Sequence, residues 1–351
     1  MPAQKTLRTL ALIFVAALMA GCDLVVLNPS GDVAAQQGRL VVISTLLMLL
    51  IIVPVIILTL VFAWRYRESA KAEYRPDWDH STQLELLIWA APLLIIIALG
   101  ALTWISTHVL DPYRPLSRID EQRALAADTK PLVIEVVALD WKWLFLYPEQ
   151  GIATVNEVAA PVDRPVQFRI TATSVMNAFY VPALAGMIYA MPGMETKLHA
   201  VINKPGIYDG FSANYSGAGF SHMRFKFHGL NDADFAQWVK TNQGAGQTLS
   251  REAYLQLERP SEREPVRRYA TVADGLYDAI LNRCVEAGKM CMHQMMAIDA
   301  NGGMGRVGLS PDALTSVQRG DRGVWIPTLA NGMCTPDNPT GERRSATTNN
   351  L

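Results

Sequence analysis

Two long apolar runs near the start of the chain limit its fold more than any other feature. The run from Leu40 to Trp64 contains no charged residue, and the run from Leu84 to Ile105 contains only Glu85. A helix rises about 1.5 Å per residue, so about 20 apolar residues cross the hydrocarbon core of a bilayer. Pro54 and Pro92 lie inside the runs, but membrane helices tolerate proline. The sequence therefore predicts two transmembrane helices, residues 40–64 and 84–105.

The basic residues predict the orientation of these helices. The connection between them, residues 65–83, contains four Lys or Arg residues, whereas residues 22–38 contain none. Loops rich in Lys and Arg stay in the cytoplasm. Both ends of the mature chain are therefore expected in the periplasm of a bacterial inner membrane protein.

The first 21 residues have the pattern of a removable secretory signal. Lys5 and Arg8 precede a short apolar stretch that ends in Ala20-Gly21-Cys22. This ending resembles the lipobox of bacterial lipoproteins, which predicts a signal peptide over 1–21 and a lipidated Cys22 at the start of a periplasmic segment, 22–39. The alternative is an uncleaved anchor in which Cys22 is incidental.

The remainder of the chain is predicted to be soluble. After a linker, 106–129, short alternating runs separated by turn residues predict an all-β domain over 130–230. Residues 231–300 have helix-like patterns and form the expected C-terminal extension. Residues 301–351 are rich in Gly, Asn, Thr and Pro and are expected to form a flexible tail.

Several functional classes are excluded by composition and motifs. The formal net charge of −1 gives no electrostatic reason to expect nucleic-acid binding. The string from Gly303 to Gly308 fits GxGxxG, but no strand-like segment clearly precedes it, so a loop is the better interpretation. The chain contains no HExxH metalloprotease motif, no Walker loop and no Cys-x-x-Cys pair.

Five strings carry a resemblance to a known family over residues 20 to 290. They are TQLELLIWAAP (82–92), DWKW (140–143), YPEQGIATVNE (147–157), SVMNAF (174–179) and YDGFSANYSG (208–217). The chain resembles subunit II of the haem-copper respiratory oxidases and is most similar to the cytochrome bo-type ubiquinol oxidases. The resemblance implies a cupredoxin-like fold for the β domain.

The resemblance also implies partners and cofactors. It predicts a proton-pumping complex in which this chain contacts subunits I, III and IV and the membrane lipids. Ubiquinol in the bilayer would supply the electrons, and the haems and one copper would lie in subunit I. No cofactor, complete active site or cytochrome c contact is expected in this chain.

The copper ligands of the related cytochrome c oxidases are replaced here. Their ligand segment reads Cys-x-Glu-x-Cys-Gly-x-x-His-x-x-Met, and a further His precedes it. The early His falls on Asn177, and the segment falls on Ser212, Asn214, Ser216, Phe220 and Met223, of which Met223 alone is retained. Serine cannot replace the soft thiolates that hold two copper ions. We therefore expect no dinuclear copper, with Phe220 filling the volume of the missing imidazole and metal.

Glu85 is the residue for which the resemblance implies a role of its own. In the family this acid, at the cytoplasmic start of the second span, lies at the entrance of a proton pathway into subunit I. The alternative is structural, because Thr82-x-x-Glu85 also fits a capping box and an acid in a first helical turn is favourable.

The cysteines beyond Cys22 leave two questions open. Cys284 and Cys291 would lie about 10 Å apart on a helix, too far for a disulfide, so Cys334 is expected to pair with one of them. Residues 290–296 concentrate Met, Cys and His, which could bind Cu(I), although a methionine-rich packing segment is the plainer interpretation. Two other functions stay open: a copper-handling periplasmic lipoprotein and a copper-bearing cytochrome c oxidase subunit.

Overall fold

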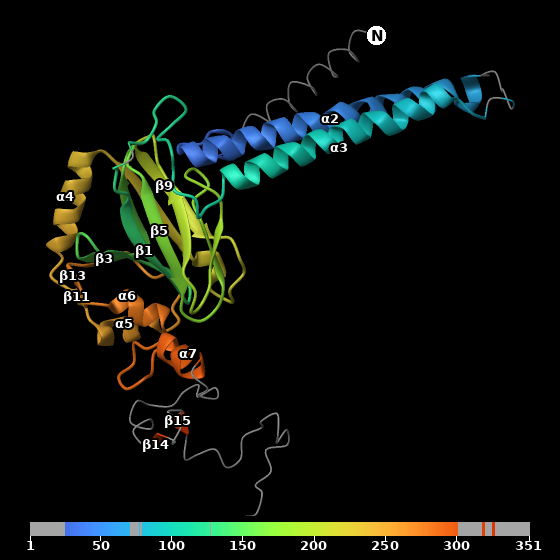
Figure 1. Ribbon diagram of the computed structural model, residues 1–351. Helices are drawn as coiled ribbons and strands as arrows, with labels where there is room; N and C mark the ends of the chain where they lie inside the picture. Colours follow the sequence, from blue (N-terminus) through green and yellow to red (C-terminus); the bar gives the residue numbers. More distant parts are fainter. Residues whose placement is uncertain are drawn as a thin grey trace, which may run out of the picture.

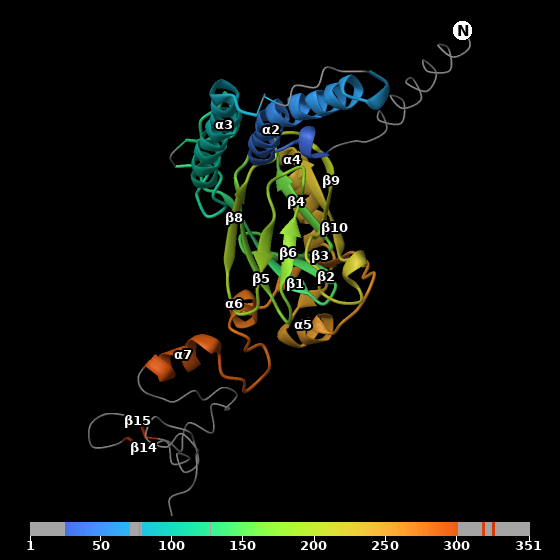
Figure 2. The same cartoon turned by 90° about the vertical axis from the view of Figure 1, so that its right-hand side faces the viewer.

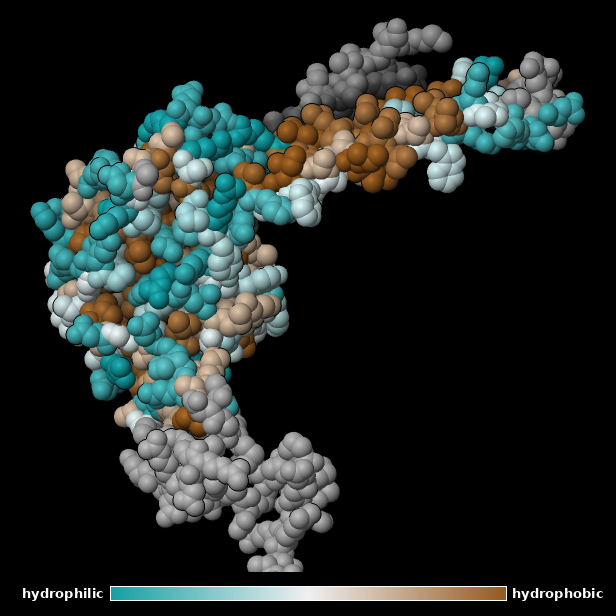
Figure 3. Space-filling view, in the orientation of Figure 1, coloured by the Kyte–Doolittle hydropathy of each residue, from teal (hydrophilic) through white to brown (hydrophobic). Residues whose placement is uncertain are grey.

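The chain forms a helical hairpin joined to a two-sheet β domain. The computed structural model describes residues 25–70, 77, 79–126, 128–300, 318–319 and 325–326. The two long helices are α2 (Asp32–Arg65) and α3 (Thr82–Val109), and both are almost fully exposed apart from the start of α2. Figures 1 and 2 show them side by side, projecting from one end of the β domain. Their surface forms a continuous brown, hydrophobic band in Figure 3. Two apolar helices of this length fit a two-pass membrane protein.

The helices are longer than the apolar runs that predicted them. α2 has 34 residues, so it spans about 51 Å at 1.5 Å per residue, well beyond the roughly 30 Å hydrocarbon core. Its first turn lies outside the apolar run, where Asp32, Val33 and Ala34 are buried against the β domain. The extra length therefore belongs to the joint between the hairpin and the domain.

The β domain is a sandwich of two mixed sheets. One sheet has the order β12-β3-β2-β1-β5-β8 and the other β4-β10-β9-β6-β7, with parallel pairs only at β1/β5 and β4/β10 within these two sheets. The strands are β1 (Leu132–Leu139), β2 (Lys142–Tyr147), β3 (Ile152–Val155), β4 (Glu157–Pro161), β5 (Val166–Ala172), β6 (Asn177–Tyr180), β7 (Ile188–Ala190), β8 (Thr196–Ala200), β9 (Gly206–Ser212), β10 (Arg224–Leu230) and β12 (Arg267–Tyr269). Short 3-10 helices lie at Val25–Leu27, Glu68–Ala70 and Phe220–His222.

Aromatic side chains fill the space between the sheets. Trp143 and Phe145 of β2 face Phe179 of β6 and Phe225 of β10, with ring centroids 5.1–6.4 Å apart. Phe179 stacks on Phe225, with the ring centroids 5.3 Å apart and the ring planes 10° from parallel. Such contacts add to the hydrophobic stabilisation of fully buried rings.

The C-terminal extension covers the outer face of the six-stranded sheet. Its elements are α4 (Asp232–Gln243), β11 (Thr248–Leu249), α5 (Arg251–Glu258), β13 (Thr271–Val272), α6 (Leu276–Leu281) and α7 (Met292–Ala300), followed by β14 (Gln318–Arg319) and β15 (Trp325–Ile326). Tyr254, Tyr269 and Tyr277 pack with the outward side chains of β1 and β2 in a second core. Because both faces of β1 and β2 are buried, their sequences are nearly continuous apolar runs with little alternation.

Candidate functional site

The lost copper-ligand positions gather at one end of the five-stranded sheet. Asn177 begins β6 and Ser212 ends β9, and the pairing of Phe179 with Ser212 brings these two strands together. The loop from 213 to 219 then leads through the 3-10 helix at Phe220 to Met223, directly before β10. The fold therefore brings all six positions into one region, although Asn177 lies 35 residues before Ser212.

Hydrogen bonds join the two strand ends at this site. Asn177 and Ser212 are 1% and 3% exposed, and the Ser212 hydroxyl lies 3.1 Å from Asn177 Oδ1. The same hydroxyl accepts from the backbone N–H of Ala178 at 3.4 Å. Buried polar groups need partners, so Ser212 and Asn177 form a satisfied pair.

The rest of the loop is fastened by Asn214 and Trp141. Asn214 Nδ2 donates to the carbonyl of Met176 at 3.1 Å, and the indole Nε1 of Trp141 donates to the carbonyl of Ser216 at 3.0 Å. A Cβ on Gly219 would lie 2.5 Å from the Trp141 ring, so only glycine fits under this indole. Trp141 itself has a φ of 69°, in the left-handed region that non-glycine residues rarely adopt. The Trp141 indole therefore holds the loop in place through its hydrogen bond to Ser216 and its contact with Gly219.

Phe220 and Met223 occupy different environments. Met223 is fully buried in the sandwich core, whereas Phe220 is half-buried and packs on the exposed ring of Tyr215 at 5.7 Å. The expectation that Phe220 would fill the interior of the former site is therefore too strong. The chain turns into the 3-10 helix at this residue, which leaves its ring at the rim of the loop.

The donor atoms at these positions do not fit a dinuclear copper centre. The side chains supply two amides, two hydroxyls, one phenyl ring and one thioether, without the thiolates and imidazoles that copper prefers. Among the described residues, no three His, Cys, Asp or Glu side chains converge as a metal site. A copper ion has no matching ligand set in this loop.

Glu85 lies at the other end of the molecule, in the first turns of α3. Its Oε1 is 2.9 Å from Nδ1 of His80, and both side chains are more than half exposed. The helix begins at Thr82 with Ser81 as its N-cap, and the Ser81 side chain makes no capping hydrogen bond. The capping box does not form, because Thr82 is the first helical residue and not the N-cap. Glu85 does lie in the first turn of α3, where an acid is favourable, so the structural alternative stays open.

The expected cysteine pairing is also wrong. Cys284 and Cys291 form a disulfide, with their Cα atoms 4.8 Å apart. The reason is that α6 ends at Leu281 and the chain turns back at Arg283, with a φ of 56°, before Cys284. The helical spacing that argued against this bond does not exist. Cys334 and Cys22 lie outside the described residues.

The methionine-rich segment packs against the β domain. Met290 is buried, and Met292 covers Gly193, whose added Cβ would lie 2.5 Å from the Met292 Cε. Cys291 is oxidised and cannot act as a thiolate ligand. The packing interpretation is favoured over a Cu(I) site.

Two features were missed by the sequence reasoning. A bidentate ion pair joins Asp32 of α2 to Arg118 of the linker, with Asp32 enclosed. β12 extends the six-stranded sheet from a segment that was expected to be helical, by pairing with β3. Single apolar residues in a polar segment, such as Tyr269, were the available signal for the strand.

Comparison with known proteins agrees with this architecture. The family "Cytochrome C oxidase subunit II, periplasmic domain" matches residues 149–229, and "COX Aromatic Rich Motif" matches 243–288. Cytochrome bo(3) ubiquinol oxidase subunit 2 of Pseudomonas aeruginosa is 49% identical over 269 residues, covering 76% of this chain and 78% of the relative.

Two further relatives carry similar names. Ubiquinol oxidase subunit 2 of Acetobacter aceti is 48% identical over 267 residues, covering 76% of this chain and 84% of the relative. Cytochrome bo(3) ubiquinol oxidase subunit 2 of Buchnera aphidicola subsp. Schizaphis graminum is 40% identical over 289 residues, covering 82% of this chain and 97% of the relative. The predicted resemblance and fold class, a two-helix membrane hairpin with a cupredoxin-like sandwich and a short helical extension, are confirmed.

The matched lengths of 269 and 289 residues exceed the β domain and all that follows it, so each match includes part of the chain before the β domain. The chain therefore belongs to the family of cytochrome bo-type ubiquinol oxidase subunit 2, a two-pass inner-membrane subunit of a respiratory oxidoreductase with its β domain in the periplasm.

Proposed function

We propose that this chain is the copper-free subunit II of a proton-pumping ubiquinol oxidase, in which it supports subunit I and carries no redox centre of its own. The observation that supports this proposal most strongly is the satisfied Ser212–Asn177 pair at the former ligand positions. A dinuclear copper centre receives electrons from a soluble protein donor at the outer membrane surface. Without one, the electrons must come from a donor that reaches subunit I through the bilayer, as ubiquinol does.

In this proposal the chemistry takes place in subunit I. Each ubiquinol gives two electrons and two protons, and two ubiquinols reduce one O₂ to two water molecules. The haems and one copper of the complex would lie in subunit I, and subunits III and IV complete the assembly. The β domain then covers the periplasmic face of subunit I, and cytochrome c has no docking role.

The test is a comparison of electron donors on the purified complex. We expect oxygen consumption with ubiquinol and none above background with reduced cytochrome c. The haem optical spectrum of the fraction that contains this chain should change on addition of ubiquinol. Oxidation of cytochrome c at a comparable rate would contradict the proposal, as would migration of this chain away from haem in native electrophoresis.

Glu85 is proposed to serve as an entrance for protons taken from the cytoplasm. Its carboxylate is exposed to water and lies beside the imidazole of His80. An exposed ion pair stabilises by about 0.2–1 kcal/mol, so Glu85→Gln should assemble normally. Turnover and proton release per electron should both fall, whereas Glu68→Gln, a change of another cytoplasmic-side acid, should leave them unchanged. Wild-type turnover in Glu85→Gln would remove this role.

Lipidation is the remaining part of the proposal. We expect the mature chain to begin at an acylated Cys22, which would add a second attachment beside the two spans. Mass spectrometry of the mature N-terminus tests this directly. Recovery of an intact Met1 would contradict it.

A further inference from the structure

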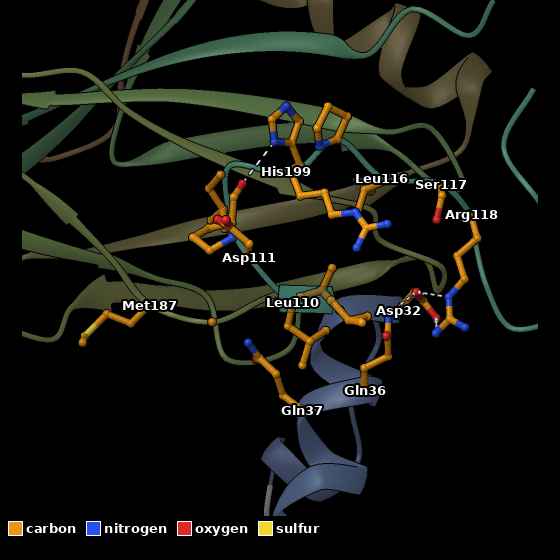
Figure 4. A pocket seen from close by; sticks show the side chains of 17 residues that line it. Asp32, Gln36, Gln37, Leu110, Asp111, Leu116, Ser117, Arg118, Met187 and His199 are labelled. Atoms are coloured by element: carbon orange, nitrogen blue, oxygen red, sulfur yellow. Dashed lines mark hydrogen bonds and ion pairs between the residues drawn. The ribbon is translucent and has the colours of Figure 1, made fainter. Parts of the chain in front are cut away.

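A cavity at the joint between the hairpin and the β domain has no role in the proposed function. Its volume is about 210 Å³, and it lies between the first turns of α2, the end of α3, the linker that follows and β8. Figure 4 shows Asp32 and Arg118 at one side of it, and Asp111 and Met187 toward the other. We propose that this cavity binds the headgroup of an aminophospholipid from the periplasmic leaflet; the inference rests on α2 and α3 crossing the membrane.

The position of the cavity corresponds to the headgroup layer. α3 ends at Val109, and the cavity begins with Val109 and Leu110. Trp104 and Tyr113, on either side of this point, are 71% and 50% exposed. Exposed Trp and Tyr side chains concentrate at the membrane–water interface. A ligand in the cavity would therefore sit at the depth of lipid phosphates.

The charges around the cavity define its ligand. Arg118 is neutralised by Asp32 through bonds of 2.9 and 3.0 Å. Within the described part of the chain, Arg114 and Asp111 form no ion pair: Arg114 makes one long bond of 3.4 Å to the His108 carbonyl, and Asp111 accepts the Tyr113 amide on Oδ1.

Arg114 and Asp111 are the ends of one tight turn, since the Arg114 amide donates to the Asp111 carbonyl at 3.1 Å. The guanidinium group of Arg114 and the carboxylate of Asp111 therefore lie together at the edge of the cavity, and they complement a ligand that carries one negative and one positive charge. An arginine fork suits a phosphate diester, and the free oxygen of Asp111 suits a primary ammonium group.

The apolar lining accounts for the rest of the lipid. Leu110, Leu116 and Leu198 form part of the cavity wall, and the exposed side chains of Ile105 and Val109 continue from it along α3. Acyl chains can follow this apolar surface into the bilayer while the headgroup stays at the rim. A free phosphate ion would leave that surface unused, which favours a lipid as the source of the phosphate.

The test uses the full-length chain in the assembled oxidase. A phosphatidylethanolamine with a photoreactive group near its glycerol is added, and the labelled peptides are identified by mass spectrometry. We expect labelling of the peptide around residues 105–118, reduced at least about tenfold by Arg114→Gln, because this change removes the charge-assisted hydrogen bonds to the phosphate. Asp111→Asn should weaken the preference for phosphatidylethanolamine over phosphatidylglycerol, because it removes the ammonium partner. Arg251→Gln, a change of an exposed arginine on α5 at the far end of the domain, is the matched control.

Three results would overturn the proposal. Arg114→Gln could label as strongly as Arg251→Gln, which would leave the cavity without a phosphate contact. Inorganic phosphate could displace the label as well as unlabelled lipid does, which would indicate an ion site. Label could appear only in a neighbouring subunit while peptide 105–118 stays protected, which would assign the cavity to a protein contact.

Discussion

The ion pair between Asp32 and Arg118 should hold the β domain in a fixed position on the membrane hairpin. Asp32 lies in the first turn of α2, and its side chain is 3% exposed, against 34% for Arg118. Gln36 donates a further bond to the same carboxylate at 2.8 Å. Asp32→Asn keeps the shape of the side chain but turns one acceptor into a donor that faces the guanidinium group.

The structure sets the expected magnitude of this change. Removing one partner of a buried pair costs about 3–5 kcal/mol. Because Arg118 keeps a third of its surface in water and can be rehydrated, we expect a loss of about 2–3 kcal/mol for Asp32→Asn. Arg118→Gln should cost more, since it leaves the enclosed carboxylate of Asp32 without a counter-charge.

Hydrogen exchange measures this loss at the joint itself. Gly31 donates to the Ala183 carbonyl and Asn203 to the Ser30 carbonyl, so both amides report opening of the joint. A loss of about 2–3 kcal/mol should speed their exchange about 30- to 150-fold.

The control is Asp209→Asn, which breaks the Lys226–Asp209 pair. That pair is 2.6 Å long but more than half exposed, and should contribute less than about 1 kcal/mol. Equal effects of Asp32→Asn and Asp209→Asn, or a milder effect of Arg118→Gln than of Asp32→Asn, would refute the reasoning.

Two other predictions concern the β domain. Metal analysis should find no stoichiometric copper in the native chain. A variant with all five ligand positions restored should bind two copper ions and show thiolate-to-copper absorption. Two copper ions in the native chain, or a folded variant that binds none, would contradict this prediction. The five changes are Asn177→His, Ser212→Cys, Asn214→Glu, Ser216→Cys and Phe220→His. Burial raises the pKa of Glu135 from an ordinary value near 4.5 to about 7, against the lowering effect of Arg169. Between pH 4.5 and 7 the folded state holds a proton that the unfolded state has lost, so this contribution to stability, on the order of 3 kcal/mol, is complete below pH 4.5 and is lost as the pH rises through 7. Glu135→Gln should flatten the pH dependence of unfolding over this range, and an unchanged pH profile would contradict the shift.

The candidate site could be located from the sequence because its evidence is local. The replaced ligands from Ser212 to Met223 stand in one short segment whose spacing is unchanged, and the amphipathic runs around it predicted strands. What fills the site was not predictable in the same way. Whether Phe220 points into the core depends on the 3-10 turn at that residue and on Tyr215 beside it. Trp141 belongs to the DWKW string, and no pattern in the sequence indicated that its indole lies over the loop.

The amino-acid sequence was enough to predict the membrane hairpin, its orientation, the strand-rich domain and the loss of copper ligands. The hairpin, its orientation and the strands follow from the length of apolar runs, the sign of nearby charges and the alternation of side chains, whereas the loss of copper ligands follows from the resemblance to the oxidase family. The Cys284–Cys291 disulfide, the extra strand β12 and the joint at Asp32 became apparent in the folded chain alone. These depend on where the chain turns and on partners far apart in the sequence: Asp32 and Arg118 are separated by 86 positions. No local pattern marks such a pair, because its energy exists only after folding has removed both groups from water.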